Sequence, residues 1–423
     1  MKDSGIEWIG EIPEGWEVSQ LKYAIRWKSE KGCPDAPVLS LYRDFGVVPK
    51  DSRDDNHNVT SLDTSNYKVV DIGDLVINKM KAWQGSMAVS DYRGIVSPAY
   101  HVCSITSNKV NKRYLHHLLR NPAYLPEYAR LSTGMRIGQW DLGFDDFKNI
   151  PFLIPPLDEQ AKIADYLDNG CASLDAILDK TRSSIEEYKK LKQAVITQAV
   201  TKGVRGDREM KDSGNPWFGQ IPADWKLSRV GLHFSIILGK MLCTAPLNDT
   251  YTLEPYYCAA DVHFDGVADG ERKKMWFSPV EKELYRVSVG DLLVVEGGAG
   301  AGGSAIVEKQ DSDTYIQNSI MIVRSKGSAD NRYLRYLLEF LVKQGYIDIV
   351  CNKATIPHFT KDKLSCVPFC LCPAGEQEEI ADYLDTKCAE IDRLIAKKEQ
   401  LVKELESYKK SLIYEVVTGK RDF

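Results

Sequence analysis

Basic, amide and aromatic side chains are interleaved in six short stretches, and these are the residues whose types could do chemistry. Three lie in the first half, "RDFGVVPKDSR", "NKMKAWQG" and "STGMRIGQWD", and three in the second, "GERKKMW", "YIQNS" and "CNKATIPHF". Lys and Arg neutralise phosphates, while Asn and Gln can form paired hydrogen bonds with adenine, as Arg can with guanine. Each stretch alone also fits a solvated surface loop. Together they predict loops that contact DNA through Arg43, Lys50, Arg53, Lys79, Lys81, Gln84, Arg136, Gln139, Trp140, Arg272, Lys273, Lys274, Gln317, Asn318, Asn352, Lys353, Thr355 and His358.

Motifs for catalysis or for holding a cofactor are not evident in the sequence. "GGAGAGG" at Gly297 contains the spacing GxGxxG, but no amphipathic helix or downstream acidic residue follows it, so a turn is the better interpretation. No phosphate loop, HExxH, GxSxG or NPPY-type tetrapeptide is present. Cys366, Cys370 and Cys372 lack the paired spacing of a zinc site. We therefore expect no catalytic residue, no metal and no cofactor bound by this chain.

The composition is that of a folded protein rather than a disordered or membrane-spanning one. Of the 423 residues, 43% are hydrophobic and 27% are charged, and the net charge is -5. Residues 17–150 nevertheless carry 18 Lys and Arg against 15 Asp and Glu, which leaves room for a local basic face. The absence of a long apolar run or a signal-like start predicts a cytoplasmic chain without a membrane span.

The elements that must position these loops occur twice. "MKDSGIEWIGEIPEGW" at Met1 and "MKDSGNPWFGQIPADW" at Met210 share ten of sixteen positions. "PFLIPPLDEQAKIADYLD" at Pro151 and "PFCLCPAGEQEEIADYLD" at Pro368 share eleven of eighteen. Between these anchors the two halves diverge, so the chain is a duplication with a retained frame and two different fillings.

Each copy of the frame ends in a long amphipathic helix without internal proline. Apolar residues recur at steps of three and four, which is the pattern of a coiled-coil seam. Two such helices in one chain most simply pair with each other. The predicted seam contains Leu174, Ile177, Tyr188, Leu191 and Val195 in the first helix and Ile391, Leu394, Leu401, Leu405, Tyr408 and Leu412 in the second.

The fillings between the anchors are typical of mixed α/β domains. "YKVVDIGDLVINKM" and "YRVSVGDLLVVE" have the β-branched residues and Gly-Asp turns of strands, and "RYLHHLL" and "RYLRYLL" predict one short helix in each domain. The predicted fold is thus mixed α and β: two α/β domains separated by two long antiparallel coiled-coil helices with pseudo-two-fold symmetry. The predicted segments are a first domain at 1–156, a helix at 157–205, a second domain at 206–373 and a helix at 374–423.

The doubled frame resembles the specificity subunit of type I restriction-modification systems over essentially the whole chain. The residues that carry the resemblance are "GEIPEGW" and "GQIPADW" before each filling, "PPLDEQAKIADYLD" and "PAGEQEEIADYLD" after it, and "SYKKSLIYEVVTGK" at the end. The first frame ends "VTKGVRGD" where the second ends "VTGKRDF", so the order of Gly and Lys departs between the copies.

The resemblance implies a division of labour between subunits. The fillings would be target recognition domains, each reading one half of a split double-stranded DNA site, and the helices would space them and bind two methyltransferase subunits. Those partners would transfer methyl from S-adenosylmethionine to adenine N6, and a restriction motor-nuclease subunit would use ATP and magnesium. This chain would be the non-catalytic subunit that recognises DNA.

The physics of DNA recognition agrees with that implication. Half-sites on opposite strands are related by a two-fold axis, so a reader made of two copies should place its helices antiparallel. Because the two fillings differ, the two half-sites should differ as well. Two other classes stay open: a coiled-coil scaffold that does not read DNA, and a self-sufficient DNA methyltransferase, for which the expected cofactor motifs are not evident.

Overall fold

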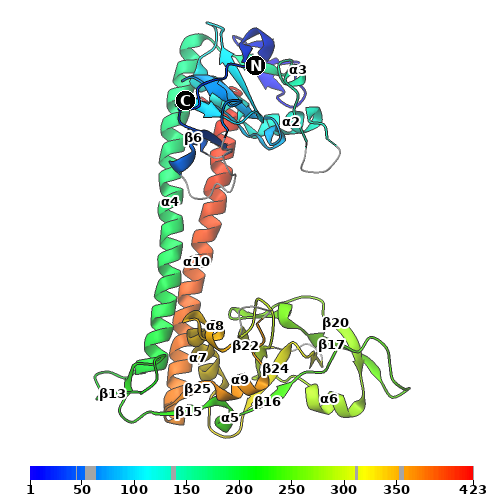
Figure 1. Cartoon of the computed structure of the whole chain (residues 1–423), viewed down its shortest axis with the longest axis vertical. Helices are drawn as coiled ribbons and strands as arrows, with labels where there is room; N and C mark the ends of the chain where they lie inside the picture. The colour runs from blue at the N-terminus through cyan, green and yellow to red at the C-terminus, as the bar shows by residue number, and fades with distance from the viewer. Residues whose placement is uncertain (44, 53–62, 135–139, 310–312, 352–356, 423) are drawn as a thin grey trace. The chain divides into compact units, whose positions relative to one another are not determined.

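The computed structural model describes residues 1–43, 45–52, 63–134, 140–309, 313–351 and 357–422. The chain forms two compact units, Met1–Ser183 together with Glu399–Phe423, and Ser184–Lys398 (Figure 1). Each unit therefore combines one of the two mixed α/β domains with part of both long helices. Within the described residues, no helix is both long and apolar enough to cross a membrane.

A four-stranded antiparallel sheet forms the centre of the first unit. Its strand order is β4 (Ile25–Lys28), β11 (Tyr100–Ile105), β8 (Asp74–Asn78) and β9 (Met87–Val89). Smaller pairs surround it: β1 (Lys2–Asp3) with β2 (Glu11–Ile12), β3 (Glu17–Gln20) with β12 (Pro151–Ile154), β5 (Leu39–Tyr42) with β6 (Gly46–Pro49), and β7 (Lys68–Val70) with β10 (Gly94–Val96). The helices are α1 (Lys112–Leu119), α2 (Leu125–Leu131) and α3 (Phe144–Phe147), with 3-10 turns η1 (Leu21–Tyr23), η2 (Lys50–Ser52), η3 (Ala82–Gln84) and η4 (Pro122–Tyr124).

The second unit repeats this plan with a larger insertion. Its main sheet has the order β16 (Phe234–Leu238), β24 (Ile320–Ser325), β21 (Leu292–Val295) and β22 (Ser304–Ile306), and β15 (Lys226–Arg229) pairs with β25 (Pro368–Leu371). The insertion is a sheet of β20 (Lys273–Phe277), β17 (Thr252–Tyr257) and β23 (Tyr315–Ile316). The remaining elements are β13 (Met210–Asp212), β14 (Gln220–Pro222), β18 (Val262–His263), β19 (Gly266–Val267), α5 (Val230–His233), η5 (Ala259–Asp261), α6 (Pro279–Tyr285), α7 (Asn331–Lys343), α8 (Tyr346–Val350) and α9 (Lys361–Cys366).

The long helices are α4 (Leu157–Lys202) and α10 (Ala374–Val417), and they run antiparallel within each unit. In the first unit, Lys409 bonds Asp175 at 2.6 Å and Arg182 bonds Glu406 at 2.6 Å. In the second unit, Lys192 bonds Asp392 at 2.6 Å. Residue numbers that rise along α4 therefore meet numbers that fall along α10, and the predicted antiparallel pairing is confirmed.

The predicted seam has the right period and the wrong phase. On α10, Ile391 and Ile395 are buried and Lys398 is half-buried, so the steps from Ile391 run four then three, whereas the prediction had three then four; Leu412 is buried as predicted. On α4 the buried apolar residues near the expected positions include Leu174, Leu178 and Ile185. Leu405, Tyr188 and Val195 are half-buried. The members of the predicted seam that are instead exposed are Ile177, Leu191, Leu394, Leu401 and Tyr408.

The EQ signature of the frame ties each long helix to the α/β domain that precedes it. The Trp16 indole donates to Glu159 at 3.1 Å, and Trp225 donates to Glu376 at 3.2 Å. The neighbouring glutamine amides donate to the carbonyls of Pro155 in the first unit and Cys372 in the second, at 2.8 and 2.9 Å. The same glutamines accept from the backbone N–H groups of Asn111 and Asp330, which are the N-caps of α1 and α7. The signature is thus an anchor and leaves the fillings free to differ.

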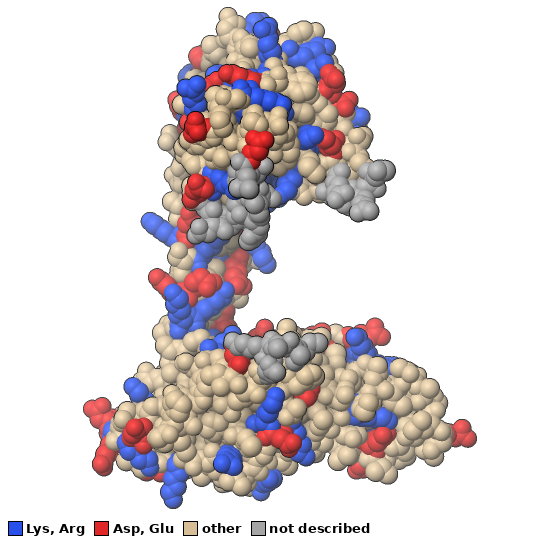
Figure 2. All heavy atoms as spheres, viewed as in Figure 1, with Lys and Arg blue, Asp and Glu red and all other residues tan. Residues whose placement is uncertain are grey.

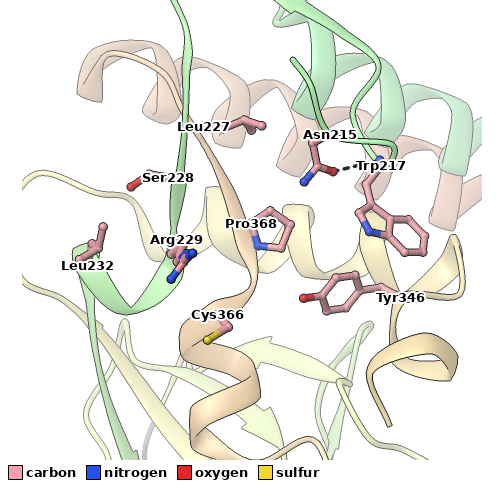
Figure 3. Close-up of a pocket in the computed structure, with 9 residues that line it drawn as sticks. All are labelled: Asn215, Trp217, Leu227, Ser228, Arg229, Leu232, Tyr346, Cys366 and Pro368. Carbon is pink, nitrogen blue, oxygen red and sulfur yellow. Dashed lines mark hydrogen bonds between the residues drawn. The ribbon is translucent and has the colours of Figure 1, made fainter. Parts of the chain in front are cut away.

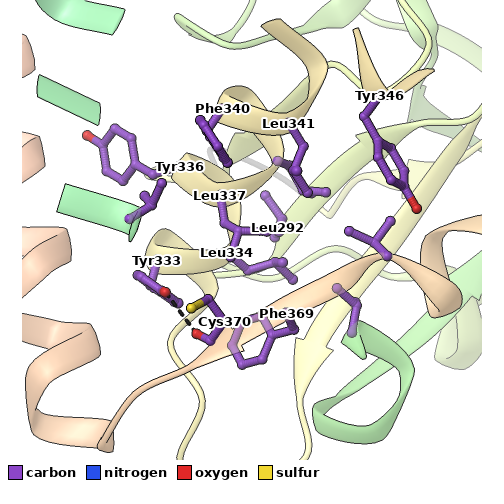
Figure 4. Close-up of a cluster of buried hydrophobic side chains, with 14 of the residues drawn as sticks. Leu292, Tyr333, Leu334, Tyr336, Leu337, Phe340, Leu341, Tyr346, Phe369 and Cys370 are labelled. Carbon is purple, nitrogen blue, oxygen red and sulfur yellow. Dashed lines mark hydrogen bonds between the residues drawn. The ribbon is translucent and has the colours of Figure 1, made fainter. Parts of the chain in front are cut away.

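The "RYL" helix of each domain packs on the main sheet and closes the core. In the second unit, Leu334, Leu337 and Phe340 of α7 lie against Leu292 and Phe369 (Figure 4). The Tyr333 hydroxyl donates to the Cys370 carbonyl at 2.8 Å, as Tyr114 donates to Leu153 at 3.2 Å in the first unit. The helix predicted in each filling is therefore confirmed, and it holds β12 or β25 in place.

The glycine-rich stretch at Gly297 is a turn between β21 and β22. Gly298 and Gly302 have φ of 89° and 83°, which L side chains rarely adopt. Its interpretation as a turn rather than a dinucleotide-binding loop is in accord with this geometry, because a strand follows it and not a helix.

Candidate nucleic-acid interface

In the first unit, several predicted contact residues meet where β8 ends. Lys79 follows the last residue of β8, and its carbonyl accepts from the N–H of Leu142 at 3.0 Å. The Lys79 ammonium lies 3.3 Å from the Asp141 carboxylate. Trp140 packs edge-on against Trp83 with ring centroids 5.3 Å apart, and Trp83 belongs to η3 between the exposed Lys81 and Gln84. Predicted residues from two separate stretches are thus brought together at one end of the sheet.

The second unit brings its predicted residues to the corresponding end of its sheet. Glu296 follows β21, its carbonyl accepts from the Phe359 N–H at 2.6 Å, and its own N–H donates to the Ser319 carbonyl at 2.8 Å. His358 Nδ1 lies 3.4 Å from the Glu296 carboxylate. Gln317 and Asn318 form the turn directly before Ser319, and both are half-buried.

The two ends are built alike and charged differently. Lys79 and Glu296 occupy equivalent positions after equivalent strands, and each carbonyl holds the residue after Asp141 or His358. The paired side chains are Lys79 with Asp141 in one domain and His358 with Glu296 in the other, so the carboxylate lies on the closing segment in the first domain and on the residue after the strand in the second. We call these two sheet ends the reading edges. A common scaffold with different side chains can recognise two different base sequences.

Other predicted residues lie away from the reading edges or are already engaged. Arg272 pairs with Asp261 at 3.0 Å and its guanidinium covers the Tyr257 ring, so it is not free to contact a base. Lys273 and Lys274 are exposed on β20. Part of β20 lines a groove of about 790 Å³ with more acidic than basic side chains, including Asp265, Asp269, Glu271, Glu308 and Asp313. A phosphate backbone is disfavoured there.

Arg43 directly follows β5, inside the β5–β6 hairpin of the first unit, and Lys50 directly follows β6. Arg43 is exposed, and its carbonyl accepts a short hydrogen bond from Arg120; Lys50 is half-buried at the start of η2. Six further predicted residues lie outside the described part of the chain and stay predictions: Arg53, Arg136, Gln139, Asn352, Lys353 and Thr355.

Three residues at the first reading edge were not predicted from the sequence: Trp27, Lys68 and His101. Lys68 is only 9% exposed, and burial lowers its pKa, with the positive charges of Lys79 and Lys31 lowering it further. Burial likewise lowers the pKa of His101, against the hydrogen bond to the Leu142 carbonyl at 3.2 Å. The sequence offered one sign of Lys68, a single lysine within the strand sequence "YKVV". The prediction considered the composition of loops and therefore passed over a residue in a strand.

The visible surface carries mixed charge rather than a basic coat. On the face drawn in Figure 2, Lys and Arg are interspersed with Asp and Glu over both units, among the residues that are coloured by charge. This agrees with the net charge of -5. Any contact with DNA therefore depends on local groups, such as those at the reading edges, and not on a uniform field.

Each frame also contains a shallow groove beside its two-stranded sheet. In the second unit Trp217, Ser228 and Pro368 line a groove of about 670 Å³ (Figure 3). In the first unit a groove of about 480 Å³ is lined by Trp8, Ser19 and other residues of the same frame positions. The grooves recur with the frame and not with the fillings, so they are no part of the reading edges.

Comparison with known proteins identifies the family. The sequence matches the family model "Type I restriction modification DNA specificity domain" twice, over residues 13–187 and 222–405. The chain belongs to this family of specificity proteins, and the two matches correspond to its two repeats.

Individual relatives extend over nearly the full chain. The specificity subunit named for the type I restriction enzyme MjaX of Methanocaldococcus jannaschii is 26% identical, with 97% of this chain and 95% of that protein covered. The MjaVIII specificity subunit of the same organism is 24% identical, with 97% and 93% covered.

Solved structures share the fold. A chain from a type I R-M system aligns with a TM-score of 0.72 at 18% identity, covering 97% of this chain and all of that one. The HsdS subunit from Thermoanaerobacter tengcongensis aligns with a TM-score of 0.57 at 17% identity, covering both chains completely. These likenesses support the doubled architecture of recognition domain and long helix.

Proposed function

We propose that this chain is the DNA-reading subunit of a type I restriction-modification enzyme and that it recognises a bipartite, asymmetric site. The observation that carries the proposal is the pair of reading edges, which share one backbone arrangement and differ in side chains. Each edge reads one half-site. Because the side chains differ, the half-sites differ, and the complete site is not a palindrome.

The test is to map methylated adenines after expressing the full chain with its cognate methyltransferase subunit. Long-read sequencing of a host that lacks other methylation should reveal one motif with two specified parts and an unspecified spacer. Replacing residues 17–150 by the corresponding segment of another specificity subunit should change one half-site and keep the other. A continuous motif, or a motif unchanged by the replacement, would contradict the proposal.

Two predicted basic residues allow a sharper test of where DNA binds. Arg136 and Lys353 lie outside the described residues, and they precede in sequence the residues that equivalent strands hold, Leu142 and Phe359. Replacing both with Ala should weaken duplex binding and reduce the slope of log K against log salt by about one for each phosphate that is no longer neutralised. An unchanged slope would remove these two residues from the interface.

We further propose that two methyltransferase subunits bind the long helices. The exposed apolar side chains on α4 and α10 support this, because the helix pair within each unit leaves them uncovered. Both units carry such residues, Ile177, Leu401 and Tyr408 in the first and Leu191 and Leu394 in the second. One methyltransferase per unit would give two per chain.

Catalysis in this proposal belongs to the partners. The methyltransferase would use S-adenosylmethionine to methylate adenine N6, and a restriction subunit would use ATP and magnesium. The purified chain alone should then bind duplex without methylating it. Methylation by the chain alone would favour a self-sufficient methyltransferase, and failure to bind any duplex, alone or in the complex, would favour a scaffold.

A further inference from the structure

Lys68 is a largely buried lysine for whose ammonium the described residues provide no carboxylate partner. It donates to the Tyr100 carbonyl at 2.5 Å and lies 5.9 Å from the centre of the Trp27 ring. No ion pair of the described residues includes it, although only 9% of the residue is exposed. Keeping a charged group in such a place is costly unless an opposite charge arrives.

Positive charges outnumber negative ones in the group around Lys68. Lys31 forms a β-bridge with Lys68 and bonds the Asn66 side chain at 3.4 Å. Lys79 is close enough to lower the pKa of Lys68, and its own partner is Asp141. Among the described residues, the group therefore holds three ammonium ions against one carboxylate, which favours an anion as ligand.

The Lys68 ammonium is placed where a large ligand could reach it. Trp27 is 50% exposed, and its ring packs against Phe144 at 5.1 Å and His101 at 5.7 Å. The bonded Tyr100 lies opposite Asn78, the residue before Lys79, so the group sits at the first reading edge. The methylene chain of Lys68 is buried in the domain, and its ammonium lies near the exposed ring of Trp27.

This arrangement is particular to the first recognition domain. The strand register places Ile236 and Met321 of the second domain at the positions of Trp27 and His101. The nine-tenths buried lysine of the second domain, Lys240, is already paired with Glu281 at 2.5 Å. The uncompensated charge is thus no general requirement of the fold.

We propose that Lys68, which lies over the Trp27 ring with Lys79 and Lys31 nearby, binds a DNA phosphate of the first half-site and fixes the position of the first reading edge. The inference rests on the proposed function. Since a phosphate contact carries no base information, it acts on affinity for all sequences alike. Lys68 is a positioning residue in this role, while the neighbouring loops supply base contacts.

The experiment measures duplex binding by the full chain with its methyltransferase partner over a series of KCl concentrations. We expect Lys68→Met to weaken binding to the mapped site and to unrelated duplex by a similar factor, and to reduce the salt slope by about one. Lys68→Arg should restore the slope. Because Lys68→Met removes an uncompensated buried charge, the variant should unfold at the same temperature as the parent or a higher one.

The matched control is Lys112→Met, which removes the same charge at the opposite end of β8. Lys112 lies against Gly73, the residue before that strand, whereas Lys79 follows it. This control should leave the slope unchanged. An unchanged slope for Lys68→Met, or a large drop in its thermal stability, would overturn the proposal. Failure of the proposed function differs from both outcomes, because the parent complex would then bind no duplex.

Discussion

Adjacent residues of α10 should lose very different amounts of stability on the same substitution. Ile395 is 9% exposed and lies between Asp392, which pairs with Lys192, and Lys398, whose ammonium covers the Tyr188 ring. Leu394 is 37% exposed on the outer face. Ile395→Asp removes buried apolar packing worth about 2 to 5 kcal/mol and buries a carboxylate without a partner, so we expect a destabilisation of at least about 4 kcal/mol.

Leu394→Asp should cost under about 2 kcal/mol, because its carboxylate can remain in water. Urea unfolding followed by circular dichroism compares the two variants directly. We expect Ile395→Asp to lose much of its helix signal at low urea and Leu394→Asp to fold normally but to bind the methyltransferase subunit weakly. Equal destabilisation by both variants, or none by Ile395→Asp, would refute the assigned phase of the helix pair.

Three other perturbations test the frame. Burial acts to raise the pKa of Asp168, but hydrogen bonds from His117 and Arg113 lower it below its usual value. The ionised carboxylate therefore stabilises the fold above the unfolded pKa near 4, and this stabilisation is lost as the pH falls through the lower folded pKa. Asp168→Asn should thus flatten the acid end of a curve of unfolding free energy against pH. Glu376→Gln removes the buried carboxylate that pairs with Arg208, whose other partner is Asp224, and should cost about 2 kcal/mol, more than Glu159→Gln, whose carboxylate forms no ion pair among the described residues; urea unfolding ranks them. Residues 1–205, expressed with the methyltransferase, should direct methylation to an interrupted palindrome; an asymmetric motif, or a monomer with no activity at any concentration, would contradict this.

The duplication made most of the architecture predictable. Repeated sequence predicted repeated structure, and Trp16 with Glu159 and Trp225 with Glu376 show why those frame residues recur. The two frames differ in the order of Gly and Lys after the long helix, "VTKG" against "VTGK", and the structure shows what the glycine does in each. Gly203 and Gly419 both adopt positive φ beyond their helices, and a side chain at either would meet the frame tryptophan, at 3.2 and 3.1 Å.

The spacing of apolar residues did not determine which face of α10 meets α4. The predicted and the observed rows of residues have the same seven-residue period and coincide at every second position. Ile391 and Leu412 belong to both patterns, and the choice between Leu394 and Ile395 depends on what the partner helix covers. Exposed leucines on the outer face are as hydrophobic as the buried ones. Two lysines also pack near the contact between the helices: Lys192 pairs with Asp392, and the Lys398 ammonium lies over the Tyr188 ring. The positions of charged residues therefore did not reveal which face is buried either.

The candidate site was predictable in part, because loop composition points to chemistry but not to distance. Lys79 and Trp140 are brought to the same end of the sheet because the Leu142 N–H donates to the Lys79 carbonyl, a contact made across 63 residues of chain. Arg272 looked equally suitable until η5 placed Asp261 beside it. Lys68 was hidden in a strand, where a buried charge without a partner is recognised only when its neighbours are known.

Each unit is completed by the end of the helix that follows the other recognition domain. Val416 and Val417 of α10 are buried with Ile163 and Leu167 in the first unit, and Ala199 and Val200 of α4 are buried with Ile380 and Leu384 in the second. In a shortened chain of residues 1–205, Ala199 and Val200 of one copy would fill the place of Val416 and Val417 on the other. The exchange of valine for alanine removes about two methyl groups relative to the native closure, worth roughly 0.8 kcal/mol each, so such a dimer should form but need a higher protein concentration.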